Sequence, residues 1–296
     1  MKTSVMGEVR VKAFAKINLA LDVLHKRDDG YHQVEMIMQA IDLADSVILL
    51  EQDGDVTVKA NIPALACDNT NLAYRAAELL KNKFNIKRGV KIVLDKKIPM
   101  AAGLAGGSAN AAAVLKGLNV LWNLGLTIPQ LEKLGAGLGS DIPFCLRGGT
   151  MLAGGRGEIL SPLPDLPECY VVLAKPNANV STAWVYGQYR PEKVMQHPDI
   201  QGMIGCLQKR DLPGVAAKVC NVLENVTIPA HPEIRQLKEY ILRHGAINSL
   251  MSGSGPTVFG LTNEISQAEF IAKKLKSHAN FGKMEIMVAK TLAGNN

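Results

Sequence analysis

One stretch of the chain decides the fold: Pro99-Met100-Ala101-Ala102-Gly103-Leu104-Ala105-Gly106-Gly107-Ser108-Ala109-Asn110. It follows an apolar run, Val90–Leu94, that predicts a strand, and it opens an alanine-rich run, Ala109–Leu124, that predicts a helix. Small residues let a backbone approach a ligand closely, and a helix N-terminus offers free N–H groups and a partial positive charge. The stretch therefore favours a phosphate site. A tight structural turn before a core helix is the alternative for such a loop taken alone.

Two familiar phosphate-binding motifs do not occur in the sequence. GxxxxGK[ST] is absent, so the stretch is not a P-loop with its lysine, and GxGxxG is absent, so there is no dinucleotide fingerprint. The sequence thus predicts a third type of phosphate loop and disfavours a nucleotide-dependent oxidoreductase.

Length and composition indicate a globular protein of one large or two medium domains. The chain has 296 residues, of which 47% are apolar and 20% charged. The net charge is +6, with lysine and arginine spread along the chain, which predicts a solvated basic surface with modest attraction for nucleotides. Few aromatic residues and no binding motif argue against nucleic acid as a partner.

The cysteines and the hydropathy pattern predict a cytoplasmic protein. An odd number of cysteines without a CxxC pair indicates buried free thiols in a reducing compartment: Cys67, Cys145, Cys169, Cys206 and Cys220. The first residues, Met1–Val5, show no apolar signal-peptide core, and no run of 18 apolar residues predicts a membrane span.

The pattern of strands and helices predicts an α+β protein with mixed or antiparallel pairing. Strands are expected at Val9–Leu24, Val34–Leu43, Ser46–Glu51, Val56–Ala60, Val90–Leu94, Tyr170–Ala174, up to Leu261 after a turn from Ser249, and Met284–Lys290. Helices are expected at Asn69–Phe84, Ala109–Leu124, from Thr127, at 199–224 and 231–244, and at Ile265–Ser277.

Three local signals refine this pattern. The turn residues Asp53-Gly54-Asp55 predict that Val56–Ala60 is the return strand of a hairpin, and Asp68 or Thr70 is expected to cap the first helix. Three prolines within Ser161–Pro167 predict a domain boundary, with domains at 1–160 and 161–296.

The glycine-rich stretch resembles the central motif of the GHMP kinase superfamily, roughly P-x-x-x-G-L-x-[GS]-S-[AS]. The residues that fit are Pro99, Gly103, Leu104, Gly106, Gly107, Ser108 and Ala109. The resemblance implies a two-domain α+β fold, with a ribosomal protein S5 domain 2-like N-terminal domain and a ferredoxin-like α/β sandwich at the C-terminus. It implies that the loop wraps the phosphates of ATP. Alanines at 101, 102 and 105, where many relatives have glycine, are a mild departure.

The same resemblance implies residues for ATP and for Mg²⁺. The ATP-binding residues would be Pro99, Met100, Ala101, Ala102, Gly103, Leu104, Ala105, Gly106, Gly107, Ser108 and Ala109, with Asn71 and Leu72 at the adenine. The Ser108 hydroxyl would lie near the phosphates and Mg²⁺, and it is the one candidate metal ligand. Lys96 or Lys97 would lie near the nucleotide, or both are solvated strand ends.

Further segments narrow the resemblance to one member of the superfamily. The acceptor of that member is a branched sugar alcohol linked to cytidine diphosphate. They are AKINL from Ala15, DGYH from Asp29, GSDIPF from Gly139 and SGSGPT from Ser252. The match implies that Lys16 and Asp141 are catalytic, and whether Asp141 removes the proton or orients the hydroxyl stays open. Taken alone, an aspartate after Gly-Ser is usually a helix cap, and a lysine between strand residues usually reaches to solvent.

For the acceptor, the match implies that Tyr31 and His32 hold the cytosine, with Tyr186, or alternatively Trp184, on the other face of the base. A half-buried structural tyrosine is the alternative for Tyr186. Asn18 and Thr182 are expected to be polar contacts. The turn from Ser252 to Gly255 would support the phosphate loop, or it is a plain turn before a strand.

We therefore expect a kinase for a small alcohol, with its ligands in a cleft between the two domains. A homoserine or mevalonate type of GHMP kinase and a non-catalytic nucleotide-binding protein of the same fold are the alternatives. The partners expected are small molecules, without nucleic acid or membrane, and the choice between monomer and homodimer stays open.

Overall fold

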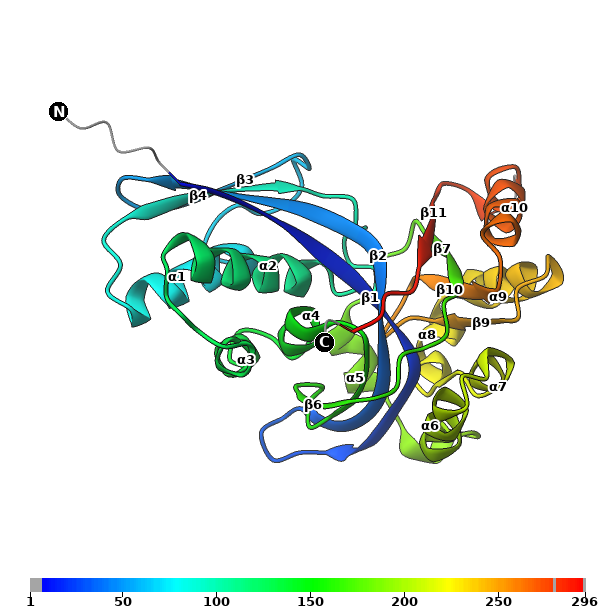
Figure 1. Ribbon diagram of the computed structural model, residues 1–296. Coiled ribbons are helices and arrows are strands. Elements are labelled where there is room, and N and C mark those ends of the chain that lie inside the picture. Colours follow the sequence, from blue (N-terminus) through cyan, green and yellow to red (C-terminus); the bar gives the residue numbers. More distant parts are fainter. Residues whose placement is uncertain (1–6, 279–280, 295–296) are drawn as a thin grey trace. The chain divides into compact units, whose positions relative to one another are not determined.

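The computed structural model describes residues 7–278 and 281–294, so the predicted absence of a signal peptide at Met1–Val5 lies outside the described residues. The chain forms two compact units (Figure 1). Unit 1 comprises the chain up to Ala15, Ala44–Ile98 and Ala105–Arg147, and unit 2 comprises Lys16–Leu43, Pro99–Leu104 and the chain from Gly148 onward. Strands β1 (Glu8–Lys26) and β2 (His32–Gln52) contribute residues to both units.

Unit 1 is a sheet covered by helices. Its strands lie in the order β3 (Val56–Ala60), β4 (Gly89–Asp95), β2 and β1. Helices α1 (Leu72–Lys83) and α2 (Gly106–Leu121) pack against each other (Figure 1), and α1 also packs on β3 and β4. The shorter helices α3 (Ile128–Ala136) and α4 (Ile142–Arg147) pack together and against α2.

The predicted hairpin of β2 and β3 is wrong, because β4 lies between them. β2 pairs antiparallel with β4, and β3 pairs parallel with β4. Gly89, at the start of β4, explains how this strand fits into the sheet between β2 and β3. A Cβ there would lie 2.4 Å from the carbonyl oxygen of Asp55, in the turn that joins β2 to β3. The turn predicted at Asp53–Asp55 is present, but β4, which follows much later in the chain, pairs with both β2 and β3 in place of the direct pairing of these two strands.

The first helix begins later than expected and has another cap. Asn71, and not Asp68 or Thr70, is the N-cap of α1, since its Oδ1 accepts a hydrogen bond of 2.9 Å from Ala73 N. Asp68 instead accepts one of 2.9 Å from Thr70 N within the preceding turn. Helix α2 begins at Gly106, three residues before the predicted start, so the glycines themselves form its first turn.

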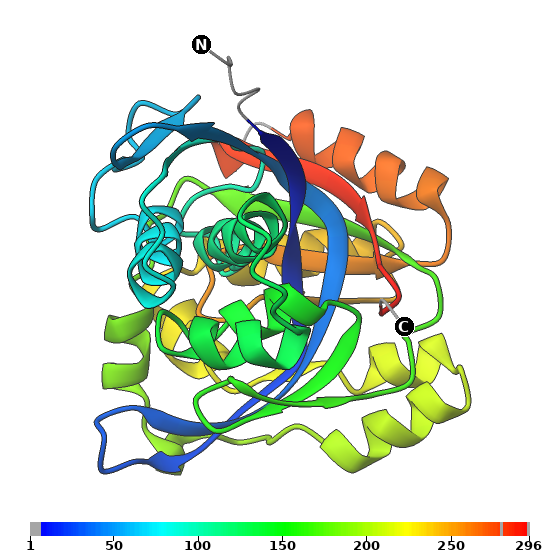
Figure 2. The same ribbon diagram turned by 60° about the vertical axis from the view of Figure 1, so that its left-hand side comes forward.

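Unit 2 contains an antiparallel sheet with the order β11 (Met284–Lys290), β7 (Tyr170–Pro176), β10 (Val258–Thr262), β9 (Asn248–Met251). Helices α9 (Glu233–Arg243) and α10 (Ile265–Lys276) pack on this sheet (Figure 2). The other strands of the unit lie in the order β6 (Ile159–Pro162), β5 (Thr150–Gly154), β2, β1, β8 (Cys220–Asn221).

The helical pattern predicted at 199–224 is present over most of this range, but it is divided into shorter helices. The region holds α6 (Ile200–Gln208) and α7 (Leu212–Ala217), after α5 (Thr182–Gln188) and the short turn Pro191–Lys193, and before α8 (Glu224–Ala230). Asp199 and Asp211 cap α6 and α7 by accepting hydrogen bonds of 2.9 Å from Gly202 N and Gly214 N. A second cap inside one apolar-periodic run therefore starts a new helix.

The predicted class, α+β with mixed and mainly antiparallel pairing, is confirmed. The prediction of five buried thiols is wrong, because Cys67 is exposed and only Cys169 is buried, while Cys145, Cys206 and Cys220 are half-buried free thiols. None of the helices in the part of the chain that the structure describes has the length and apolar character that crossing a bilayer requires. The domain boundary at residue 160 stays a prediction.

Candidate active site

Lys16, on β1, is tied to the glycine-rich stretch within unit 2. Its side chain is buried, and Nζ donates hydrogen bonds of 2.8 Å to the carbonyl oxygen of Gly103 and 2.6 Å to Asn18 Oδ1. Its backbone N also donates to Leu104 O at 3.3 Å. The alternative of a lysine that reaches to solvent is therefore wrong. The buried Asn18 orients this ammonium group.

Gly103 is fixed between two of the sequence motifs. Its φ is +72°, and a Cβ there would lie 2.2 Å from the carbonyl oxygen of Ser252, so only glycine fits. Ser252 Oγ donates a hydrogen bond of 3.0 Å to Gly103 O. A Cβ on Gly253 would lie 3.3 Å from Gly103 O and 3.4 Å from Lys16 Nζ. Segments around 16, 103 and 252 thus meet at one point.

The turn from Ser252 to Gly255 is held by residues that sequence reasoning missed. Asn221, on β8, is buried and its Nδ2 donates hydrogen bonds of 2.8 Å to the carbonyl oxygens of Met251 and Gly253. The predicted acceptor contact Thr182 also reaches this turn, with its Oγ1 2.9 Å from Ser254 Oγ. Isolated asparagines carry no spacing signal, so only the fold could find Asn221.

The remainder of the glycine-rich stretch belongs to unit 1 and starts helix α2. Ala105 is the N-cap, with a left-handed φ of +59° and no side-chain hydrogen bond to the first turn. Ala101, in unit 2, also has a positive φ of +48°. Left-handed backbone costs a residue with a Cβ roughly 1–2 kcal/mol, so the alanines carry strain that glycine would relieve. The first-turn amides of Gly106 and Gly107 are those a helix leaves without intrahelical partners.

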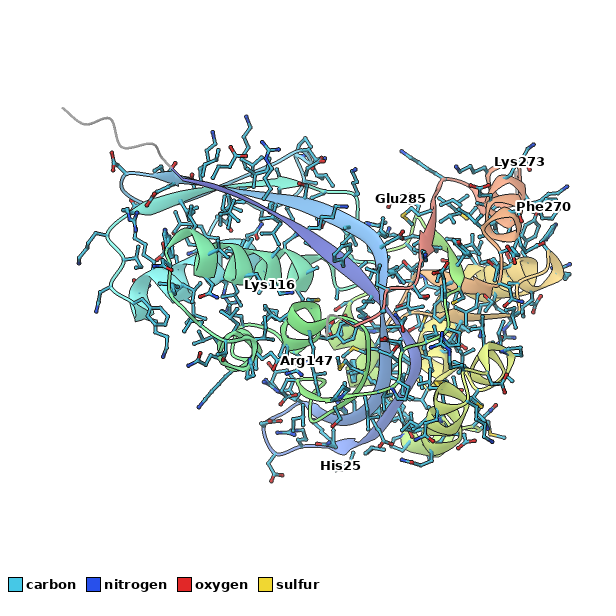
Figure 3. The ribbon with its side chains drawn as sticks, viewed as in Figure 1. His25, Lys116, Arg147, Phe270, Lys273 and Glu285 are labelled. Carbon is cyan, nitrogen blue, oxygen red and sulfur yellow. The ribbon has the colours of Figure 1, made fainter. Side chains whose placement is uncertain are left out.

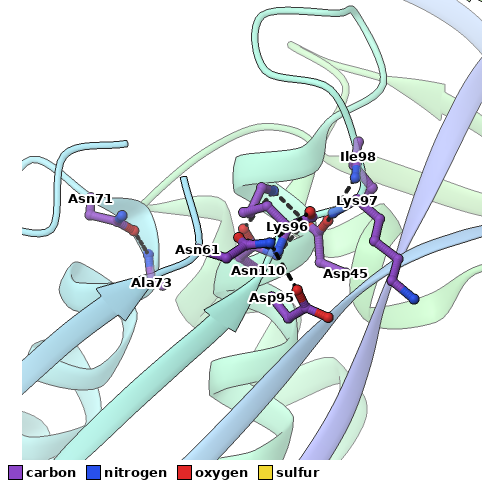
Figure 4. Close-up of polar contacts among 9 residues, drawn as sticks. All are labelled: Asp45, Asn61, Asn71, Ala73, Asp95, Lys96, Lys97, Ile98 and Asn110. Atoms are coloured by element: carbon purple, nitrogen blue, oxygen red, sulfur yellow. Dashed lines mark hydrogen bonds and ion pairs between the residues drawn. The ribbon is translucent and has the colours of Figure 1, made fainter. Parts of the chain in front are cut away.

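Lys96 is not a solvated strand end. It is buried, and its Nζ forms an ion pair with the buried carboxylate of Asp45 and donates to Asn110 Oδ1 at 2.9 Å (Figure 4). The next residue, Lys97, is exposed, as the alternative interpretation has it, while its backbone N donates to Asp45. Asp45 was not among the residues selected from the sequence.

Ser108 and the turn before Asp141 lie together in unit 1. A Cβ on Gly139 would lie 3.9 Å from Ser108 Oγ. Asp141 is half-buried and directly precedes α4, where its carbonyl oxygen accepts a hydrogen bond of 3.1 Å from Cys145 N. The buried residues Ile142 and Phe144 follow it in the chain.

An ion pair fixes the two helices that flank this turn. Arg147, labelled on α4 in Figure 3, donates from Nε to Glu132 Oε1 at 2.6 Å and from its second guanidinium nitrogen to Oε2 at 2.8 Å. The bidentate geometry ties α4 to α3 and holds the Asp141 turn from both sides. Burial lowers the pKa of Lys116, which lies on the adjacent helix α2 (Figure 3).

The two residues predicted at the adenine stand at the start of α1. Asn71 uses its side chain as the helix cap and donates from Nδ2 to Ala66 O at 2.6 Å. Leu72 lies beside the glycine-rich stretch, with its Cδ1 3.7 Å from the place of a Cβ on Gly107. Contact of either residue with adenine stays a prediction.

The aromatic residues predicted for the acceptor gather in unit 2. The ring of His32 lies 5.3 Å from that of Tyr186 and 6.5 Å, edge-on, from that of Tyr189. Tyr31 is exposed, and the guanidinium of Arg156 lies 4.7 Å from the centre of its ring. Burial, with a smaller contribution from Lys26, lowers the pKa of His32 and so favours the neutral ring. Base binding by these residues stays a prediction.

Two family models match the chain. The model described as GHMP kinases N terminal domain matches residues 71–149, and the model described as GHMP kinases C terminal matches residues 203–280. The first range contains the glycine-rich stretch and Asp141. The second contains the turn from Ser252 to Gly255.

Similar proteins carry more specific names. The 4-diphosphocytidyl-2-C-methyl-D-erythritol kinase of Geobacillus sp. (strain WCH70) is 51% identical over 90% of this chain and 92% of its own. The enzyme of that name from Listeria innocua is 50% identical, over 91% and 92%. A crystal structure of 4-(cytidine 5'-diphospho)-2C-methyl-D-erythritol kinase is 32% identical, with a TM-score of 0.79 over 97% of this chain and 100% of that one. Homoserine kinase from Cytophaga hutchinsonii shares the fold, with a TM-score of 0.79 over 99% and 97% of the chains at 21% identity.

Proposed function

Because the chain belongs to the 4-diphosphocytidyl-2-C-methyl-D-erythritol kinases of the GHMP kinase family, we propose that it transfers the γ-phosphoryl group of ATP to the 2-hydroxyl of 4-diphosphocytidyl-2-C-methyl-D-erythritol. The product is the 2-phosphate, and the reaction is a step of the non-mevalonate (methylerythritol phosphate) isoprenoid pathway. A cytoplasmic location goes with this role.

One observation carries the proposal: the ammonium of Lys16 donates to the carbonyl oxygen of Gly103, inside the phosphate loop. The contact places a buried cation beside a backbone that only glycine can form. Phosphoryl transfer depends on positioning and on stabilising the charge of the equatorial oxygens. A buried ammonium fixed to the loop is suited to both tasks, and Lys16 would stabilise the transferred group and orient the acceptor hydroxyl.

Asp141 would be the acceptor of the hydroxyl proton or the group that orients the hydroxyl. Asp141 is half-buried, and the buried residues Ile142 and Phe144 follow it in the chain. A carboxylate in hydrogen-bond reach of an alcohol assists its attack, and in a loose transition state orientation is the larger part. Both roles predict loss of turnover without loss of nucleotide binding.

The phosphates of ATP would be held by the main-chain amides at the start of α2, where the macrodipole favours anions. The residues present fit Mg²⁺ brought by ATP, because the half-exposed Ser108 hydroxyl is an oxygen donor at this helix start. Mg²⁺ neutralises phosphate charge when it is bound. Among residues 7–278 and 281–294, no group of three or more His, Cys, Asp or Glu side chains could hold a metal ion, and Mg²⁺ commonly relies on substrate phosphates.

The cytosine of the acceptor would stack between Tyr31 and Tyr186 and hydrogen-bond to His32. The rings of His32 and Tyr186 already lie 5.3 Å apart, which supports a shared site. Stacking on an aromatic contributes about 1–3 kcal/mol per base. Asn18 and Thr182 would then contact the sugar alcohol.

An ADP-release assay tests the function. The purified protein is supplied with ATP and Mg²⁺ and with 4-diphosphocytidyl-2-C-methyl-D-erythritol, homoserine or mevalonate in parallel. We expect turnover with the cytidylyl substrate alone, and phosphorus NMR of the product should show a new phosphomonoester on the 2-hydroxyl. Turnover with homoserine or mevalonate would support the corresponding GHMP kinase, and ATP binding without turnover on any acceptor would support a non-catalytic member.

A further inference from the structure

A single carboxylate binds both stems of the phosphate loop. Asp45 lies where β2 enters unit 1, and its side chain has an exposed fraction of 0%. Its Oδ1 accepts hydrogen bonds of 2.7 Å from Lys97 N and 2.8 Å from Ile98 N. These two amides belong to the segment that leads from β4 into the loop. The entry stem is thereby fixed to β2.

The other oxygen of the same carboxylate binds the exit stem. Asp45 Oδ2 accepts a hydrogen bond of 2.8 Å from Nδ2 of Asn110, on α2, and it also pairs with Lys96 Nζ. Lys96 Nζ in turn donates to Asn110 Oδ1 at 2.9 Å, which closes the triangle drawn in Figure 4. Entry strand and exit helix are therefore joined through one buried group.

The cluster lies directly beneath the first residue of α2. A Cβ on Gly106 would be 3.2 Å from Lys96 Nζ and 3.0 Å from a side-chain carbon of Ile98. Asn61 fixes Lys96 from the other side, because its Oδ1 accepts from Lys96 N at 2.8 Å and its Nδ2 donates to Asp95 Oδ1 at 2.9 Å. Every polar atom of the Asp45 carboxylate is used.

We propose that Asp45 is a positioning residue for ATP, which holds the two stems of the phosphate loop at a fixed separation, with Lys96 as its counter-ion and Asn110 as its link to α2. The inference rests on the proposed function. Main-chain amides can bind phosphates tightly only when they are held in place before the ligand arrives, and a buried, fully hydrogen-bonded carboxylate provides that rigidity. Removing one partner of such a cluster leaves the others unsatisfied.

Two variants test the contribution of each stem to ATP binding. Asn110→Ala releases the exit stem alone and keeps the ion pair of Asp45 and Lys96. Asp45→Asn keeps the shape and one acceptor oxygen for the entry stem, but its amide turns a donor toward Lys96 and Asn110. Leu49→Ala is the matched control, because Leu49 is a buried residue of the same strand that packs on α2 at Gly117, well beyond Asn110, so its loss lowers stability without removing a hydrogen bond from either stem.

The readouts are ATP dissociation constants from titration calorimetry and steady-state constants for both substrates, with unfolding followed in parallel. We expect Asn110→Ala and Asp45→Asn each to raise the dissociation constant and KM for ATP about tenfold or more, because misplacement by about 1 Å loses up to a hundredfold. The KM for the cytidylyl acceptor should stay within about twofold of the wild type. Leu49→Ala should change neither constant.

The inference is overturned if both variants match Leu49→Ala in ATP affinity at comparable stability, or if the KM values of ATP and acceptor rise together. Should Asp45→Asn fail to fold, Asn110→Ala alone decides by the same criteria. Failure of the proposed function looks different: the wild-type protein would bind ATP in the calorimeter and leave the cytidylyl acceptor unphosphorylated, while the ATP dissociation constants of the variants still test the role of Asp45.

Discussion

The ammonium of Lys16 donates a 2.8 Å hydrogen bond to the carbonyl oxygen of Gly103, a residue 87 positions further along the chain. The contact joins the first strand to the phosphate loop, and Ser252 joins the same carbonyl oxygen from the C-terminal part of the chain. Three motifs that look independent in the sequence therefore form one hydrogen-bonded cluster around the carbonyl oxygen of Gly103. Its parts should fail together when any of them is altered.

Replacement of Lys16 by methionine should reduce kcat by about 10²–10³-fold, because one fixed donor at a charged transition state contributes about that much. Lys175→Met is the control: Lys175 is also buried in unit 2, and its Nζ lies 3.7 Å from Glu285. That variant should keep kcat near the wild-type value. Equal kcat values for the two variants in the ADP-release assay would remove Lys16 from the mechanism.

Gly103→Ala should lower the free energy of unfolding by about 1–3 kcal/mol and raise the KM for ATP. The methyl would lie 2.2 Å from Ser252 O at a φ of +72°, so the loop must shift. Gly107→Ala is matched to it in the same loop, because its methyl would meet Leu72 at an ordinary 3.7 Å. Urea denaturation should separate the two. A stable Gly103→Ala protein would contradict the contact.

Part of this site could be predicted from the residues themselves, and part only from the resemblance to the GHMP kinases. The glycine-rich stretch before a helix by itself favoured a phosphate site, whereas Lys16 and the turn at Ser252 were assigned to that site through the resemblance. The structure brings Lys16, Gly103 and Ser252 together. Asp141 and Ser108 lie in unit 1, and their meeting with Lys16 stays a prediction.

The parts that sequence reasoning missed depend on long-range partners. Asp45 resembles any aspartate within a strand, and nothing in the spacing indicates that it pairs with Lys96 and binds Asn110. The hairpin prediction failed for the same reason, because Gly89 lets a distant strand enter where local turn residues favour a close return. Local propensity cannot register a partner that only tertiary packing supplies.

Asp141→Ala should retain ATP binding and lose turnover by at least about 10²-fold, the usual share of general acid–base assistance. Asp165→Ala provides a comparison, since Asp165 accepts a hydrogen bond of 2.8 Å from Gly294 N and is not part of any predicted site. Calorimetric titration with ATP and the ADP-release assay give the two readouts. Near-normal turnover of Asp141→Ala would show that the assignment of this residue is wrong.

Thiol labelling should distinguish the cysteines at pH 8. Cys67 is exposed and should react first with a chromogenic disulfide. Burial raises the pKa of Cys169 to about 11, so its reactive thiolate is scarce at pH 8 and the thiol itself is covered. Cys67→Ser should therefore abolish the fast phase, and Cys169 should react only in denaturant. Fast labelling of Cys169 in the native protein would contradict its burial.

Acidification should weaken acceptor binding through His32. Burial disfavours the imidazolium, so the pKa of His32 lies below its ordinary value of 6.5. Folding favours the neutral ring, so its contribution to stability is complete above pH 6.5 and is lost as the pH falls through the lowered pKa. The KM for the cytidylyl acceptor should likewise stay constant from pH 8 to 6.5 and rise below that range. The KM for ATP should not show this rise, because His32 is predicted to contact the acceptor and not ATP.

The variant His32→Asn should remove this rise, because asparagine keeps a donor and an acceptor but does not titrate there. His25→Asn, at the exposed end of β1 (Figure 3), should keep it. Steady-state measurements at constant ionic strength provide the two profiles. If the rise persists in His32→Asn, another group titrates in acceptor binding. If the rise in the acceptor KM at low pH also disappears in a Tyr186→Ala variant, the rings of His32 and Tyr186 contact the same base. The 5.3 Å separation of the two ring centres predicts this result.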